Sequence, residues 1–134
     1  MKYAFCQHSR LNELDSIQIK HPLFKATILL QGAQIIEFSP AHHHFQNALW
    51  LSPNAEYKTG ESVRGGIPLC WPWFGAADKN PDNIRQCIQR PTAHGFARGS
   101  LWQLKEINES SHQVEILLTL TTTSDSHQYW PYDF

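Results

Sequence analysis

The chain has 134 residues, 41% of them hydrophobic and 12% aromatic, and its formal net charge is -1. This length suits one domain, and the lack of a basic excess argues against a general nucleic-acid or membrane-surface binder. No apolar segment approaches the roughly 20 residues that span a bilayer. We therefore expect a single globular domain with neither nucleic acid nor membrane as its partner.

Alternating apolar residues predict short strands in the first part of the chain. They cover residues 16–20, 24–31 and 34–38, and a further apolar segment lies at 48–51. An alternation of period two is typical of strands, and Gly32 marks a tight turn between two of them. Residues 53–63 are predicted to form a loop, with a turn at Gly60.

The second part of the chain predicts one helical turn and one hairpin. The turn is expected near residues 84–88, and the hairpin joins 102–107 to 113–122 across 108–111. A long stripe of period 3.6 is lacking, and short connections favour antiparallel pairing. The predicted class is therefore all-β with an antiparallel sheet.

The number and spacing of the cysteines indicate the redox state of the compartment in which the protein works. Cys6, Cys70 and Cys87 are odd in number and form no C-x-x-C pair. The first ten residues hold no long apolar segment of the kind found in secretory signals. Reduced thiols in a cytoplasmic protein are the expectation.

The most unusual stretch is residues 64–75, Arg-Gly-Gly-Ile-Pro-Leu-Cys-Trp-Pro-Trp-Phe-Gly. The glycine pair allows positive φ and close approach to a ligand, and Trp71, Trp73 and Phe74 offer large rigid faces. Arg64 carries a guanidinium that matches a phosphate or carboxylate. The segment is either one wall of a site for a small polar ligand or a buried turn that wraps an aromatic core.

A second motif, residues 94–98, reads His-Gly-Phe-Ala-Arg. His94 can transfer a proton or donate a hydrogen bond near pH 7. Arg98 could face the same pocket as Arg64 and hold an anion with it. The alternative is structural, with Arg98 in a surface ion pair and His94 in a structural hydrogen bond.

These two motifs, with Trp102 four residues after the second, resemble the D-hexose-6-phosphate epimerase branch of the aldose 1-epimerase (galactose mutarotase-like) family. The resemblance extends upstream through residues 29–38 and 49–52. It implies an antiparallel β-sandwich, the galactose mutarotase-like supersandwich, here incomplete. It also implies an isomerase that interconverts the α and β anomers of a hexose 6-phosphate without metal or organic cofactor. Arg64 and Arg98 would then line the substrate site, and His94 would border it.

The family's members are longer than this chain, and their catalytic histidine and glutamate lie in later segments. Residues 1–134 are therefore expected to be the N-terminal portion of a single β-sandwich domain. His112 and His127 lie too early to match the catalytic histidine. No catalytic residue is assigned, and the fragment alone is expected not to catalyse anomer exchange. An uncovered strand edge is expected to favour self-association.

Three further features of the sequence bear on function. The run His42-His43-His44 predicts a solvated loop and no metal site, because neighbours on a strand alternate faces. Cys70 lies among apolar residues, so a nucleophilic thiol is not expected there. The alternative function is a non-catalytic carbohydrate-binding sandwich in which Trp71, Trp73 and Phe74 stack on sugar rings.

Overall fold

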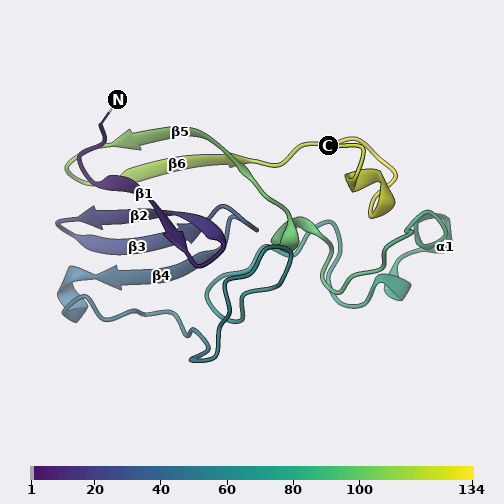
Figure 1. Ribbon diagram of the computed structural model, residues 1–134, viewed down its shortest axis with the longest axis horizontal. Coiled ribbons are helices and arrows are strands. Elements are labelled where there is room, and N and C mark those ends of the chain that lie inside the picture. Colours follow the sequence, from purple (N-terminus) through teal and green to yellow (C-terminus); the bar gives the residue numbers. More distant parts are fainter. Residues whose placement is uncertain (1) are drawn as a thin grey trace.

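The computed structural model describes residues 2–134, and they form two antiparallel sheets. One is four-stranded in the order β1-β2-β3-β4, and the other is the hairpin β5-β6, which lies beside it (Figure 1). The strands are β1 Cys6–Leu11, β2 Leu14–His21, β3 Phe24–Leu29, β4 Ile35–Pro40, β5 Gln103–Glu109 and β6 Val114–Thr119. The all-β, antiparallel prediction is confirmed.

Most predicted strands are found, and two predictions differ from the structure. Strand β1 was not predicted, because its sequence does not alternate. The apolar segment 48–51 contributes one isolated bridge, between Leu51 and Gly65. The expected helical turn is present two residues early, as α1, Asp82–Arg85.

Strand β1 is held at its start by a carboxylate. Glu109, at the end of β5, accepts backbone N–H bonds from Ala4 at 2.6 Å, Phe5 at 2.9 Å and Cys6 at 2.7 Å. Strand β1 then pairs with β2 from Cys6↔Ile19 to Leu11↔Leu14 across a two-residue turn. The position of β1 thus depends on a contact about a hundred residues away in sequence, which explains why alternation alone missed it.

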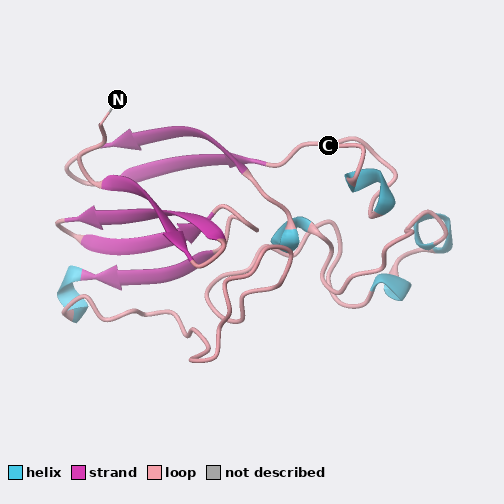
Figure 2. Cartoon of the chain, viewed as in Figure 1, coloured by secondary structure: helices cyan, strands magenta, loops and turns pink. Residues whose placement is uncertain are grey.

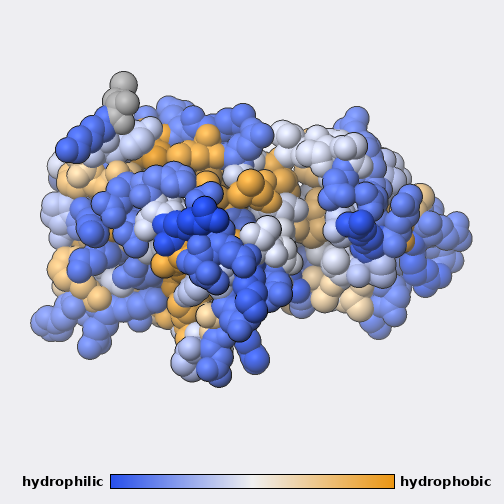
Figure 3. All heavy atoms as spheres, viewed as in Figure 1, coloured by the Kyte–Doolittle hydropathy of each residue, from blue (hydrophilic) through white to orange (hydrophobic). Residues whose placement is uncertain are grey.

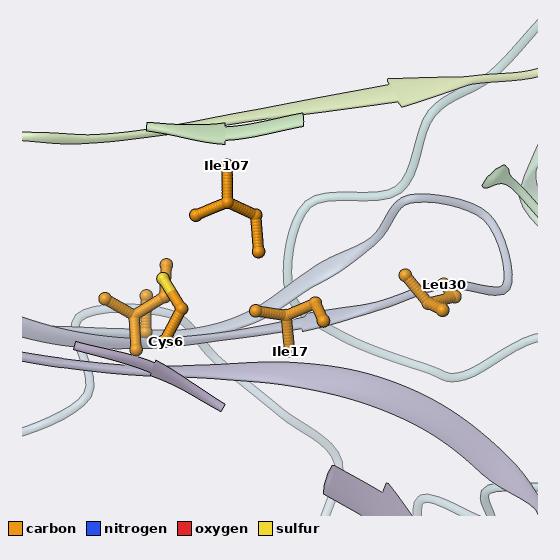
Figure 4. Packing of buried hydrophobic residues seen from close by; sticks show 6 residues of the cluster. Cys6, Ile17, Leu30 and Ile107 are labelled. Carbon is orange, nitrogen blue, oxygen red and sulfur yellow. The ribbon is translucent and has the colours of Figure 1, made fainter. Parts of the chain in front are cut away.

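Apolar side chains fill the space between the hairpin and the four-stranded sheet. Ile107 points from β5 toward Cys6 and Ile17, and Leu30 closes one end of the layer (Figure 4). Burying each isoleucine or leucine side chain contributes roughly 1.5–3 kcal/mol relative to leaving it exposed. This packing of one sheet on another makes the strands a β-sandwich.

The rest of the chain is built mainly from loops and single helical turns (Figure 2). Part of it, residues 51–63, covers the other face of the sheet, where Val63 packs with Leu29 and Ile36. Beyond the sandwich a third cluster joins Trp73 and Phe96 to residues near the C-terminus. The helical turns, besides α1, are η1 Ala41–His43, η2 Ala77–Lys79, η3 Ala97–Gly99 and η4 Ser126–Gln128. Within residues 2–134, no helix has the length and apolar character needed to cross a membrane.

Candidate functional site

The two glycine-containing motifs lie side by side. Trp71 and Gly95 form a parallel bridge, and the Trp71 carbonyl accepts N–H bonds from Phe96 at 3.0 Å and Ala97 at 3.2 Å. Farther along, the His94 N–H donates to the Gly75 carbonyl at 2.7 Å. Three backbone hydrogen bonds thus join the motifs, which sequence analysis had expected to share one site.

The contact between the motifs requires glycine at position 95. Gly95 is buried, its φ is +69°, and a Cβ built on it would overlap the carbonyl of Trp71. A side chain would therefore both strain the backbone and push the two motifs apart. The sequence signal for this glycine was its place between a histidine and an aromatic residue.

His94 is half-buried and fixed on both sides of its ring. Its Nδ1 accepts the backbone N–H of Gly75 at 3.0 Å, and its ring lies 4.5 Å from that of Phe74, centroid to centroid. The structural hydrogen bond raised as an alternative is therefore present. Because Nδ1 accepts, the neutral ring carries its proton on Nε2, which makes no hydrogen bond within residues 2–134.

Arg98 lies in the turn η3 and lines a cleft of about 600 Å³. Its Nη2 donates to the Ala93 carbonyl at 3.1 Å, and within residues 2–134 it forms no ion pair with an acidic side chain. Ser62, Thr92 and Tyr129 are among the other residues that line this cleft. The walls are thus mixed in character, with hydroxyl groups, the aromatic rings of Phe96, Tyr129 and Phe134, the Asp125 carboxylate and the Arg98 guanidinium.

Arg64 is exposed and lies on the neighbouring loop. Among the described residues its guanidinium makes neither a hydrogen bond nor an ion pair with another residue. Val63, between Ser62 and Arg64, is 6% exposed and points into the core. Arg64 itself is not among the residues that line the cleft, whereas Ser62, two residues before it, is.

The structure brings only some of the predicted site residues to the cleft. His94 and Arg98 lie on one turn, but only Arg98 is among the residues that line the cleft. The aromatic residues divide too: Trp73 is 8% exposed and donates its indole N–H to Thr92, so it belongs to the core. Phe74, by contrast, is 77% exposed and offers a free face.

Two buried glutamines that sequence analysis did not single out hold the Arg64 loop. Gln31 binds Gly60 and Glu61, and Gln34 binds the carbonyls of Val63 and Gly65. Their signal in the sequence was a pair of amides that bracket a glycine turn between two apolar strands. No metal-binding group of three His, Cys, Asp or Glu side chains exists within residues 2–134.

The fold defines a class, the antiparallel β-sandwich proteins. Comparison with known proteins gives the family. The aldose 1-epimerase family model matches residues 15–134, and the chain belongs to that family.

Two relatives with curated names are identical to this chain at about two fifths of the aligned positions. The chain is 41% identical over 125 residues to a protein of Escherichia coli K12, and 40% identical to one of Salmonella typhimurium LT2, each named "Putative glucose-6-phosphate 1-epimerase". Each alignment covers 93% of this chain and 39% of the relative. This chain therefore spans about two fifths of the length of the relatives it matches.

A solved structure agrees with the sandwich. It is described as a "putative mutarotase (YeaD)" from Salmonella typhimurium and superposes with a TM-score of 0.84 at 35% identity, covering 99% of this chain and 41% of that one. The recognised resemblance and the sandwich fold are thereby confirmed. The roles of Arg64, His94 and Arg98 stay predictions.

Proposed function

We propose that this chain forms the phosphate-binding part of an isomerase that interconverts the anomers of a hexose 6-phosphate. The observation that carries the proposal is the junction of the two motifs. Arg98 follows the bonded residues Phe96 and Ala97 and lines the cleft, and Arg64 lies two residues after the cleft-lining Ser62. Neither guanidinium is in an ion pair within residues 2–134. Membership of the aldose 1-epimerase family and the printed names of the relatives support the reaction and the substrate class.

The arginines would place the substrate. A phosphate monoester carries two negative charges or nearly so at neutral pH, and each charge-assisted hydrogen bond to it contributes roughly 1.5–3 kcal/mol. Fixing the phosphate at Arg64 and Arg98 would hold the sugar ring near His94, whose free Nε2–H can donate to a hydroxyl. Placement alone lowers the barrier of a later proton transfer.

Anomer exchange itself needs two proton transfers. A base takes the proton of the C1 hydroxyl while an acid protonates the ring oxygen, and the opened chain rotates about C1–C2 and closes again. Each positioned group typically contributes ~10²–10⁴-fold. We assign neither role within residues 2–134 and propose that this chain by itself leaves the exchange rate of glucose 6-phosphate anomers at its buffer value. Exchange NMR measures it, and a faster rate that His94→Ala abolishes would show the proposal to be wrong.

Calorimetric titration tests the binding proposal. Glucose 6-phosphate should bind more tightly than glucose, and Arg64→Ala or Arg98→Ala should weaken binding by about 10- to 100-fold. Arg10→Ala is the matched control, because the Arg10 side chain binds only carbonyls of the β1–β2 turn. A loss of affinity as large in the control as in the other two variants would contradict the proposed arginine sites.

The alternative function is a carbohydrate-binding module without catalysis. The exposed rings of Trp71 and Phe74 favour it, but the buried Trp73 cannot serve as a stacking face. Such a module would bind glucose and glucose 6-phosphate alike, since stacking does not sense phosphate. The same titration therefore separates the two functions.

Three further parts of the proposal concern the chain as a whole. We propose a cytoplasmic location, supported by three cysteines that are free in the structure. We also propose self-association through the edge of the hairpin sheet. Strand β6 pairs only with β5 within residues 2–134, and its Leu117 is 52% exposed. Apolar surface is also visible on the sandwich half of the molecule (Figure 3). Sedimentation across a concentration series tests it. The assignment of residues 1–134 to the N-terminal portion of one domain stays a prediction.

A further inference from the structure

The turn between β3 and β4 contacts the backbone of both arginine segments. On one side the Gly32 N–H donates to the Ser100 carbonyl at 2.7 Å, and a Cβ at Gly32 would overlap the carbonyl of Arg98. Two residues later, Gln34 reaches the loop that carries Arg64. One tight turn thus lies against both segments that carry the proposed phosphate ligands.

Gln34 holds the two carbonyls that flank Arg64. Its side chain belongs to a residue that is 3% exposed, and Nε2 donates to the Val63 carbonyl at 2.9 Å and to the Gly65 carbonyl at 2.6 Å. Both hydrogens of the amide are used, which fixes the amide's orientation, since a flipped amide would bring its own oxygen against two carbonyls.

The neighbouring backbone completes this restraint. The carbonyl of Arg64 accepts the Ser52 N–H at 3.0 Å, and the Gly66 N–H donates to the Trp50 carbonyl at 2.7 Å. Residues 63–66 are therefore tied on one side to residues 50–52 and on the other to Gln34. The Arg64 guanidinium has no partner of its own within residues 2–134, so its direction depends on this backbone.

Gln31 binds a different part of the same loop. Its Oε1 accepts the Gly60 N–H at 2.8 Å, and its Nε2 donates to the Glu61 carbonyl at 2.8 Å. Gln31 is buried, at 6% exposed, and comes from the same turn. A third bond joins Gln31 Nε2 to the Lys58 carbonyl at 3.4 Å. The two glutamines thus match in type and burial, but only Gln34 contacts the residues beside Arg64.

We infer that Gln34 is a positioning residue for Arg64, which aims the guanidinium at the phosphate of the ligand. The inference rests on the proposed function for the identity of the ligand. The role is indirect: the amide binds carbonyls, and its effect on an anion passes through Arg64.

The first test uses no ligand. Amide hydrogen exchange is compared in the chain and in the variants Gln34→Met and Gln31→Met, which keep the side-chain length and remove the amide. Gln34→Met should speed exchange at Ser52 and Gly66 by at least about fivefold, since two lost hydrogen bonds of ~0.5–1.5 kcal/mol each amount to ~1 kcal/mol or more. It should leave Gly60 unchanged, and Gln31→Met should do the reverse.

The second test measures binding of glucose 6-phosphate in a double-mutant cycle. Gln34→Met should weaken binding by about tenfold in the chain and by less than twofold in an Arg64→Ala background, because coupled residues are not additive. Gln31→Met should weaken binding less than Gln34→Met does. A purely structural role for Gln34 would give the same loss in both backgrounds.

The outcomes separate the two proposals. If the chain itself does not bind glucose 6-phosphate, the proposed function is wrong, and the exchange experiment still decides whether Gln34 fixes the Arg64 backbone. If Gln34→Met leaves Ser52 and Gly66 unchanged, or if both variants speed exchange equally at all three amides, the inference is overturned. Equal binding losses with and without Arg64 would overturn it as well.

Discussion

The sandwich and the loop-built region at the other end of the molecule (Figure 1) are stabilised in different ways. The sandwich uses repeated antiparallel pairs and one layer of apolar side chains between its sheets. The loop region relies on single backbone contacts, such as the bridge of Trp71 to Gly95, and on buried amides such as Gln34. A ladder spreads its stabilisation over many equivalent bonds, whereas each contact in the loop region is unique. Changes in the two regions should therefore have separable effects.

The largest effect is expected in the sandwich. Leu29 is fully buried and packs with Leu14 and Ile36. Leu29→Ala should lower the free energy of unfolding by about 2–5 kcal/mol, the sum of lost transfer energy and a cavity. Urea denaturation measures it, with Leu23→Ala as the control on an exposed side chain. A loss below 1 kcal/mol would mean that the sheet is not the main source of stability.

A second substitution should act on the loop region. Gly95→Ala should cost about 2–4 kcal/mol, because φ is positive and the new Cβ meets the carbonyl of Trp71. The rate at which a thiol reagent labels each cysteine in native buffer locates the effect. Labelling of Cys70, in the loop region, should speed up more than labelling of Cys6, in the sandwich core. Gly60→Ala is the control, since φ is also positive there but nothing lies within 4 Å of its Cβ.

Equal acceleration at both thiols would show that the two regions unfold together. The Cys6 thiol is a suitable reporter, because burial, and then the neighbouring Glu109 carboxylate, raise its pKa to about 12. At neutral pH it reacts only when the sandwich opens, since the thiolate is the reactive form.

The strands of the sandwich were predicted from the sequence more fully than the contacts of the loop region. The difference follows from how each region is stabilised. Strands such as β2 and β3 show the apolar alternation that any sheet with a buried face requires. A shared pocket for the two motifs was one of two alternatives that their residues left open, and the family resemblance favoured it. The hydrogen bonds of Gln34 could not be predicted from the sequence, because an amide binds whichever carbonyls the tertiary structure brings to it. Strand β1 was missed for the same reason, since Glu109 fixes its start.

An effect of intermediate size on the free energy of unfolding, dependent on pH, is expected at Glu109, where β5 meets the N-terminal segment. Burial pushes the pKa of Glu109 upward, but the N–H bonds from Phe5, Ala4 and Cys6 outweigh it, so the net pKa is lowered. A lowered pKa means that this stabilisation is present above the ordinary glutamate value of about 4.3 and is lost as pH falls through the folded-state value.

Glu109→Gln tests this linkage. At pH 7 it should cost about 1–2 kcal/mol, a value reduced because the carboxylate is partly exposed to solvent. Denaturation at pH 7, 5 and 3 should show the variant and the parent chain converging as pH falls below about 4. Glu115→Gln, an exposed change on β6, is the control. A difference that stays constant with pH would show that the carboxylate's charge contributes nothing there.

The smallest effect compares two serines of the sandwich. Ser16 and Ser39 are 0% and 1% exposed, but the Ser39 hydroxyl donates to Glu37 at 3.0 Å, while the Ser16 hydroxyl has no hydrogen-bond partner within residues 2–134. A buried hydroxyl without a hydrogen-bond partner lowers stability through its desolvation, so removing it does not destabilise the fold. Removing a hydroxyl that is hydrogen-bonded loses the stabilisation of that bond. Ser16→Ala should therefore leave stability unchanged or raise it by up to about 1 kcal/mol, and Ser39→Ala should lower it by about 1 kcal/mol.

Denaturation curves of the two serine variants, measured side by side, check the sign of each change. The contrast also bears on the two regions. A strand can hold an unpaired hydroxyl because its backbone ladder already fixes its position, as for Ser16 opposite Leu29. The Arg64 loop has no such ladder, so its buried amides must be bonded. A clear destabilisation by Ser16→Ala would mean that this hydroxyl binds a partner after all, and that buried polar groups are as necessary in the sandwich as in the loops.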